Sequence, residues 1–99
     1  MKRVAVDDLP DDPLAAAALF HQHWLSYVEQ QLEGGLDVVI TVPAADHTHR
    51  EWCRAVTAGL ARKHAPCRVN MVAGEGAALD ETIAYLADAP GVTGQYLET

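Results

Sequence analysis

The chain has few basic residues, few cysteines and no long apolar run. Seven Lys and Arg stand against fourteen Asp and Glu, so the formal net charge is −7 and the pI is about 4.9. An acidic surface repels phosphate backbones, which argues against a nucleic-acid partner. No apolar run approaches the roughly 18 residues that a membrane span needs, and the N-terminus lacks the apolar core of a signal peptide. We therefore expect a cytoplasmic protein that binds neither nucleic acid nor membrane.

Cysteine is limited to Cys53 and Cys67. In a reducing compartment such residues are ordinarily free, half-buried thiols rather than a disulfide. What the sequence does contain is a high apolar content, 49% of its 99 residues, much of it Ala, Val and Leu. This composition is typical of one folded domain with a modest core, for which oligomerisation would add stability.

Apolar patterning predicts an alternation of strands and helices. The strands are expected at residues 4–6, 37–42, 69–72 and 95–97, and the helices at about 13–32, 48–64 and 79–88. The run at 37–42, Asp-Val-Val-Ile-Thr-Val, does not alternate between apolar and polar residues, which suits a parallel strand buried on both faces. The alternation predicts a three-layer α/β domain of about four parallel strands, with right-handed crossovers and helices on both faces of the sheet.

Motifs in the second half of the chain resemble the short-chain dehydrogenase/reductase family. Residues 60–66, Leu-Ala-Arg-Lys-His-Ala-Pro, lead into Arg-Val-Asn-Met-Val-Ala-Gly at 68–74. In that family a helix ending in Leu-Ala…Ala-Pro precedes a strand reading Arg-Val-Asn-x-Val-x-Pro-Gly. Ala-Tyr-Leu-Ala at 84–87 and Val-Thr-Gly-Gln at 92–95 match the following helix and strand in order. The resemblance implies a half-Rossmann fold and a single truncated Rossmann-like domain over residues 1–99.

The resemblance does not extend to the family's catalytic residues. Counted back from Pro66, the family's tyrosine falls on Asp46, its lysine on Arg50 and its serine near Pro43. The lysine lowers the pKa of the tyrosine phenol, which protonates the substrate oxygen, and a carboxylate with a guanidinium cannot do this. No segment corresponds to the glycine-rich dinucleotide turn. We expect no catalytic residue, no cofactor and no enzyme activity of the chain alone, while a role as a subunit of an oxidoreductase complex stays open.

Other polar groups are weaker candidates for a site. Zinc held by His47, His49 and Cys53 would lack a suitably spaced fourth ligand, so we predict no metal site. Asp46 and Arg50 are four residues apart and are expected to form a surface ion pair. A minimal enzyme using Asp46 with His47 or His49 would have no oriented nucleophile, so it is the least favoured hypothesis.

A second apolar face on the first two helices predicts oligomerisation. Its expected members are Phe20, Trp24, Tyr27, Gln31, Trp52, Val56 and Leu60. In the resembled family these helices form a four-helix bundle with a neighbour, so we expect the chain to be a subunit of an assembly. Because the catalytic residues are replaced, we expect this subunit to be a pseudoenzyme. Its partner would be itself, as a homodimer or higher oligomer, or a full-length short-chain dehydrogenase/reductase that it stabilises or regulates. The alternative is a nucleotide- or acyl-CoA-binding module, lined by residues 42–45 and 73–76 at the carboxyl ends of the strands.

Overall fold

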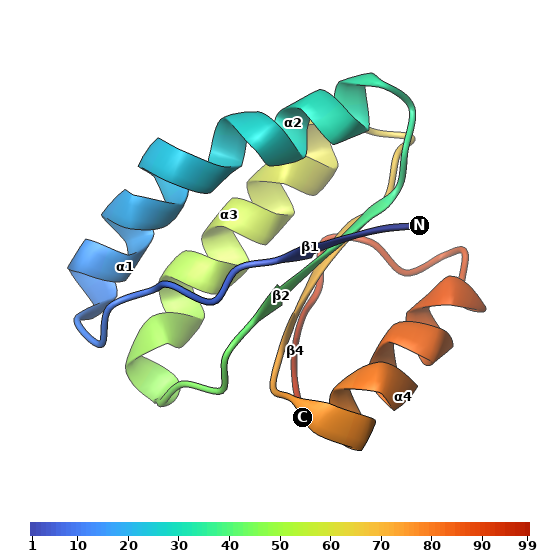
Figure 1. The fold of residues 1–99 in the computed structure, drawn as a ribbon. Coiled ribbons are helices and arrows are strands. Elements are labelled where there is room, and N and C mark those ends of the chain that lie inside the picture. Colours follow the sequence, from blue (N-terminus) through green and yellow to red (C-terminus); the bar gives the residue numbers. More distant parts are fainter.

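A computed structural model describes all residues, 1–99, as a four-stranded parallel sheet between two helical layers (Figure 1). The strands are β1 (Lys2–Ala5), β2 (Val38–Val42), β3 (Val69–Ala73) and β4 (Tyr96–Glu98), in the spatial order β1-β2-β3-β4. The helices are α1 (Pro13–Leu19), the π-helical η1 (Phe20–Trp24), α2 (Leu25–Glu33), the 3₁₀ turn η2 (His47–His49), α3 (Arg50–Lys63) and α4 (Gly76–Ala87). The predicted three-layer α/β class is confirmed.

The core lies on both sides of β2 and β3, in which every residue is buried. The two strands pair in parallel from Val38 opposite Val69 to Val42 opposite Ala73. Because side chains alternate along a strand, Val38 and Ile40 face η1, α2 and α3, whereas Val39 faces α4. This explains why the apolar runs are continuous rather than alternating.

The crossover through α4 differs in hand from the first two. The connections from β1 to β2 and from β2 to β3 pass over one face of the sheet, and α4 passes over the other face (Figure 1). All three connections step in the same direction across the sheet. Crossovers that step in one direction over opposite faces have opposite hands, so the expectation that all are right-handed is wrong. Hydrogen bonds between the 92–95 turn and β3 hold β4 at this position.

The first helical segment is continuous but contains the π turn η1. Asp12 caps α1 by accepting a 2.9 Å hydrogen bond from the N–H of Ala15. The buried face then passes from Phe20 to Val28, a spacing of eight residues. In an ideal α-helix eight residues advance about 80° beyond two turns, and the wider π turn removes that offset. Phe20 is thereby placed in the core and not on the outer face that the sequence predicted.

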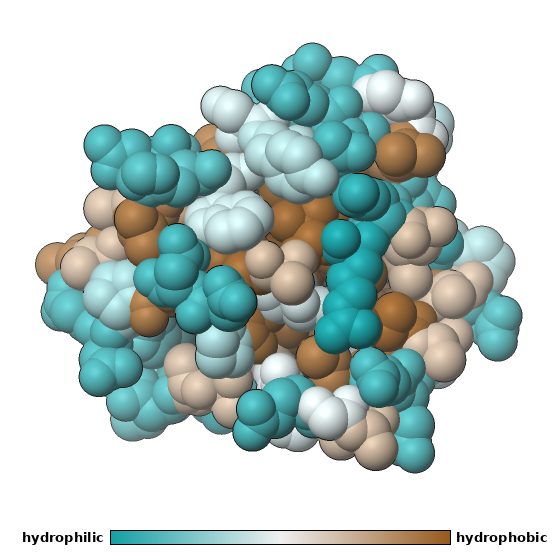
Figure 2. All heavy atoms as spheres, viewed as in Figure 1, coloured by the Kyte–Doolittle hydropathy of each residue, from teal (hydrophilic) through white to brown (hydrophobic).

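Several element ends differ from the prediction by one to three residues. Strand β1 is Lys2–Ala5, and α4 begins at Gly76 rather than near Leu79. Strand β1 lies at the edge of the sheet, with Lys2 and Arg3 exposed on it. On this side of the molecule apolar residues are exposed in small groups among hydrophilic ones (Figure 2). Cys53 and Cys67 are free thiols, and no helix combines the length and apolar character needed to cross a bilayer.

Candidate functional site

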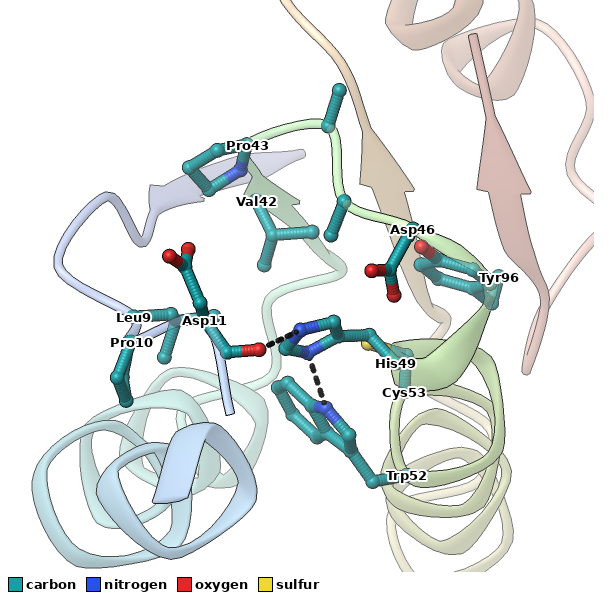
Figure 3. A pocket seen from close by; sticks show the side chains of 12 residues that line it. Leu9, Pro10, Asp11, Val42, Pro43, Asp46, His49, Trp52, Cys53 and Tyr96 are labelled. Carbon is teal, nitrogen blue, oxygen red and sulfur yellow. Dashed lines mark hydrogen bonds between the residues drawn. The ribbon is translucent and has the colours of Figure 1, made fainter. Parts of the chain in front are cut away.

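A cavity of about 410 Å³ opens at the carboxyl end of β2 (Figure 3). The loop before α1 forms one wall, the loop from β2 to α3 forms a second, and the start of α3 with Tyr96 of β4 closes it. Its lining comprises Leu9, Pro10, Asp11, Val42, Pro43, Ala44, Ala45, Asp46, His49, Trp52, Cys53 and Tyr96. Ligands of α/β domains commonly bind at this edge, and the volume lies within the range of small-molecule sites.

His49 is held by two hydrogen bonds in the cavity wall (Figure 3). The indole N–H of Trp52 donates to Nδ1 at 3.1 Å, and an indole can only donate, so Nδ1 carries no proton. The proton therefore lies on Nε2, which donates to the carbonyl oxygen of Asp11 at 2.9 Å. His49 as a whole residue is 6% exposed. With both nitrogens engaged, His49 has no free nitrogen to act as a base or to bind a metal.

The thiol and phenol of the cavity are not activated. Burial raises the pKa of Cys53 to about 12 and, chiefly by the same desolvation, that of Tyr96 to about 12. A thiol becomes a good nucleophile only as the thiolate, and a phenol acid for carbonyl chemistry needs a lowered pKa. The cavity therefore presents polar groups that can bind, but no prepared nucleophile or acid.

Asp46 and Arg50, which the motif spacing predicted at the family's tyrosine and lysine positions, do not contact each other. Asp46 begins η2 and accepts hydrogen bonds from the N–H of Thr48 at 3.0 Å and from its hydroxyl, and these bonds lower its pKa. Arg50 instead donates to Glu98 on β4 at 2.5 Å. The predicted ion pair is wrong because the Asp46 side chain turns back onto its own helix start.

The carboxyl ends of the strands form two cavities rather than one. Residues 42–45 line the larger cavity, as the ligand-binding hypothesis requires. Gly74 and Glu75 line only a smaller one, of about 190 Å³. Thr99 covers Gly74 and donates its hydroxyl to Ala73 O at 2.8 Å, and a Cβ on Gly74 would overlap the Thr99 side chain. The two predicted linings therefore do not converge on the main site.

The residues predicted as an interface fall into three places. Phe20 is fully buried, while Val56 and Leu60 are buried at the floor of a groove between α2 and α3. Trp24 donates to Asp8 at 3.1 Å and, with Tyr27 and Gln31, lies outside this groove. The groove, about 350 Å³, is lined by His21, Leu25, Glu29, Trp52, Ala55, Val56, Gly59, Leu60 and Lys63. Whether any of these residues contacts a partner stays a prediction.

Polar bonds close one end of this α2–α3 groove. Glu29 of α2 accepts from Lys63 at 2.6 Å and lies 3.0 Å from Nε2 of His64. The hydrogen bond from Lys63 is the largest cause of the lowered pKa of Glu29. These contacts tie the end of α3 to α2 and fix the width of the groove.

Sequence reasoning missed Tyr96 and the loop at 9–11 as parts of a site. Tyr96 could have been found from strand alternation, since it pairs in register with Met71 and faces the same helical layer. The loop at 9–11 gave no such signal, because only the fold brings Asp11 beside His49. In the described chain no group of three His, Cys, Asp or Glu is placed to hold a metal ion.

The parallel sheet, its order and its helical layers define a Rossmann-like α/β domain. A family model for short chain dehydrogenase-like proteins matches residues 4–99, so the chain belongs to that SDR-like family. The match extends the resemblance from the second half of the chain back to β1. Searches of curated proteins and of solved structures returned no match.

Proposed function

We propose that this chain is a non-catalytic member of its family, acting as a subunit of a larger assembly. The observation that supports this proposal is that Asp46 and Arg50, which the motif spacing assigns to the tyrosine and lysine positions, are each engaged in a structural hydrogen bond. The neighbouring His49, Cys53 and Tyr96 supply no substitute acid or nucleophile. Without such groups a carbonyl substrate cannot be protonated as hydride arrives.

The groove between α2 and α3 is the surface through which we propose assembly. It is predominantly apolar, and a Cβ on Gly59 would meet no atom within 4 Å. Together with Ala55, Gly59 leaves a depression in α3 into which a partner side chain can pack, as small residues allow helices to approach closely. Leu25 and Trp52 border the depression and supply the anchors that such interfaces favour. The partner is a second copy of this chain or a full-length short-chain dehydrogenase/reductase.

The variant Gly59→Leu tests this surface without weakening the monomer. Leucine fills the open space, and replacing a helical glycine stabilises a helix by roughly 0.8 kcal/mol. We expect the unmodified chain to sediment as two or more copies, or to capture a full-length reductase, at micromolar concentration. Gly59→Leu should lose that mass while melting at the same or a higher temperature. A matched control, Ala84→Leu on the exposed face of α4, should keep the assembly.

Two outcomes contradict the proposed assembly. One is a wild-type chain that is strictly monomeric and also captures no reductase. The other is a Gly59→Leu chain whose mass is unchanged, which would place the interface elsewhere. Reduction of a carbonyl substrate by the chain alone with a nicotinamide cofactor would refute its non-catalytic nature.

The alternative of a nucleotide- or acyl-CoA-binding module receives less support from the cavity. Its lining includes Asp11 and Asp46 but no Lys or Arg, and carboxylates repel phosphate groups. A thermal-shift screen with nicotinamide cofactors and acyl-CoA compounds tests this alternative directly. Stabilisation of the chain by these ligands would favour it over our proposal.

A further inference from the structure

We propose that the cavity beside His49 binds a small organic cation, an ammonium group carried on a short apolar body. This site shares Trp52 with the assembly groove, but its two carboxylates lie outside that groove. The proposal rests on the sign of the charges in the cavity lining, on its aromatic and apolar walls, and on the fixed position of Trp52.

The charges that reach the cavity are all negative. The carboxylates of Asp11 and Asp46 come from opposite walls, the loop before α1 and the start of η2 (Figure 3). Arg50, the neighbouring cation in sequence, is paired with Glu98 and does not line the cavity. The Asp11 side chain has no hydrogen-bond partner, and Oδ2 of Asp46 is likewise free. An ammonium group between them would meet two carboxylate acceptors, and the net charge of −7 would add long-range attraction.

The remaining lining suits the apolar body of such a ligand. Val42, Pro43 and Leu9 provide aliphatic surface, and Trp52 and Tyr96 provide aromatic rings. Aromatic rings attract alkylammonium groups through their π faces in addition to burying apolar area. An anion would lose these contacts and face both carboxylates, whereas a neutral ligand would keep only the apolar part.

Trp52 is fixed in the wall and therefore reports on the cavity. Its indole N–H donates to His49, and its ring packs against Phe20 with centroids 5.7 Å apart. Trp24 is the other tryptophan and lies outside the cavity lining. The variant Trp24→Phe leaves Trp52 as the only tryptophan, so its emission follows occupancy of the site.

The experiment titrates the Trp24→Phe chain with three probes that share a benzyl group. These are benzyltrimethylammonium, benzyl alcohol and benzoate, which carry positive, zero and negative charge. We expect saturable binding of the cation, at least about ten-fold weaker binding of the alcohol, and no binding of benzoate. In the unmodified chain the NMR signal of the Trp52 indole N–H should shift with the same dissociation constant. Because this second measurement uses the unmodified chain, it tests the proposal even if Trp24→Phe disturbs folding.

Charge variants assign the binding to the two carboxylates. Asp46→Asn keeps an oxygen that caps η2, and Asp11→Asn leaves the backbone carbonyl bonded to His49. Each should weaken binding of the cation by roughly five-fold or more. Asp88→Asn, the same charge change at the exposed end of α4, should stay within about two-fold, which controls for net charge.

Three results would overturn the proposal. They are equal affinity for cation and alcohol, no saturable binding of the cation, or equal effects of the Asp46 and Asp88 variants. Trp52 lines both sites, but Asp11 and Asp46 lie outside the α2–α3 groove and Gly59 lies outside the cavity, so the variants at these positions separate the two tests. The chain can therefore fail to bind the cation and still assemble, and it can fail to assemble and still bind the cation.

Discussion

Replacement of Asn70 by leucine should destabilise the fold more than other single polar substitutions. Asn70 is fully buried in β3, where both ends of its amide bond to the turn before β4. Nδ2 donates to the carbonyl oxygen of Val92 at 3.0 Å, and Oδ1 accepts from the N–H of Gln95 at 3.1 Å. Leucine has a similar shape but no polar atom, so it leaves both backbone groups without their partner.

The cost follows from those two groups. Each buried polar group left unpaired costs about 1–3 kcal/mol, so the pair costs about 2–6 kcal/mol before relaxation. Burial of leucine in place of an amide returns about 1 kcal/mol. We therefore expect a loss of about 1–5 kcal/mol, which is large beside the 5–15 kcal/mol typical of a domain. The turn at 92–95 should also gain backbone hydrogen exchange, because its anchor is removed.

Urea unfolding followed by tryptophan fluorescence measures the loss. The control Thr82→Val removes a hydroxyl that donates to Ala78 O within α4, on the exposed side of the molecule, and should change stability by less than about 0.5 kcal/mol. Asn70→Asp distinguishes a specific bond from simple packing. Its carboxylate can accept from Gln95 but repels the carbonyl of Val92, so its stability relative to wild type should improve in acid, where a protonated oxygen can donate. A loss below 1 kcal/mol for leucine, or no recovery of aspartate in acid, would refute this reasoning.

Three further predictions concern other residues. Gly94 has φ +76° and would place a Cβ 3.2 Å from that of Ala61, so Gly94→Ala should cost about 1–3 kcal/mol in urea unfolding. The pKa of Asp37 is lowered, first by the N–H of Arg68 that donates to it and then by the Arg68 guanidinium. The stabilisation by ionised Asp37 is thus present above its unfolded pKa near 4 and is lost as pH falls through its folded pKa. Asp37→Asn should therefore flatten the acid side of the curve of unfolding free energy against pH and leave its basic side unchanged. Cys53, with a pKa of about 12, should resist thiol reagents at pH 8 until the chain unfolds, whereas the partly exposed Cys67 should be modified first; early labelling of Cys53 would contradict its burial.

The fold could be predicted because its strongest signals are local. The continuous apolar run that forms β2, the cap at Asp12 and the Gly-Gly end of α2 each act within a few residues. The motif order then identified the family. The parallel sheet, the number of layers and the family all agree with those signals.

The candidate site could not be predicted to the same degree, because its geometry depends on contacts between distant segments. The π turn at Phe20–Trp24 changes which residues face the core, and a period of 3.6 residues does not reveal it. Asp11 and His49 are 38 positions apart and meet only in the folded chain. Arg50 had an acidic residue four positions away but pairs with one 48 positions away. Residue spacing therefore indicated the segment that contains His49 and Arg50 but predicted the wrong ion-pair partner for Arg50.

The motifs that mark the family are bonded to one another in this chain. The N–H of Val69 donates to Thr93 Oγ1 at 3.1 Å, and Gly94 N–H donates to Val69 O at 2.7 Å. Asn70 bonds to the same turn through both ends of its amide, and the Arg68 guanidinium donates to the carbonyls that end α4. These bonds hold β4 beside β3 against the usual preference for a right-handed crossover. These motifs therefore contribute to the architecture of this chain, and their presence predicts the fold without by itself indicating catalysis.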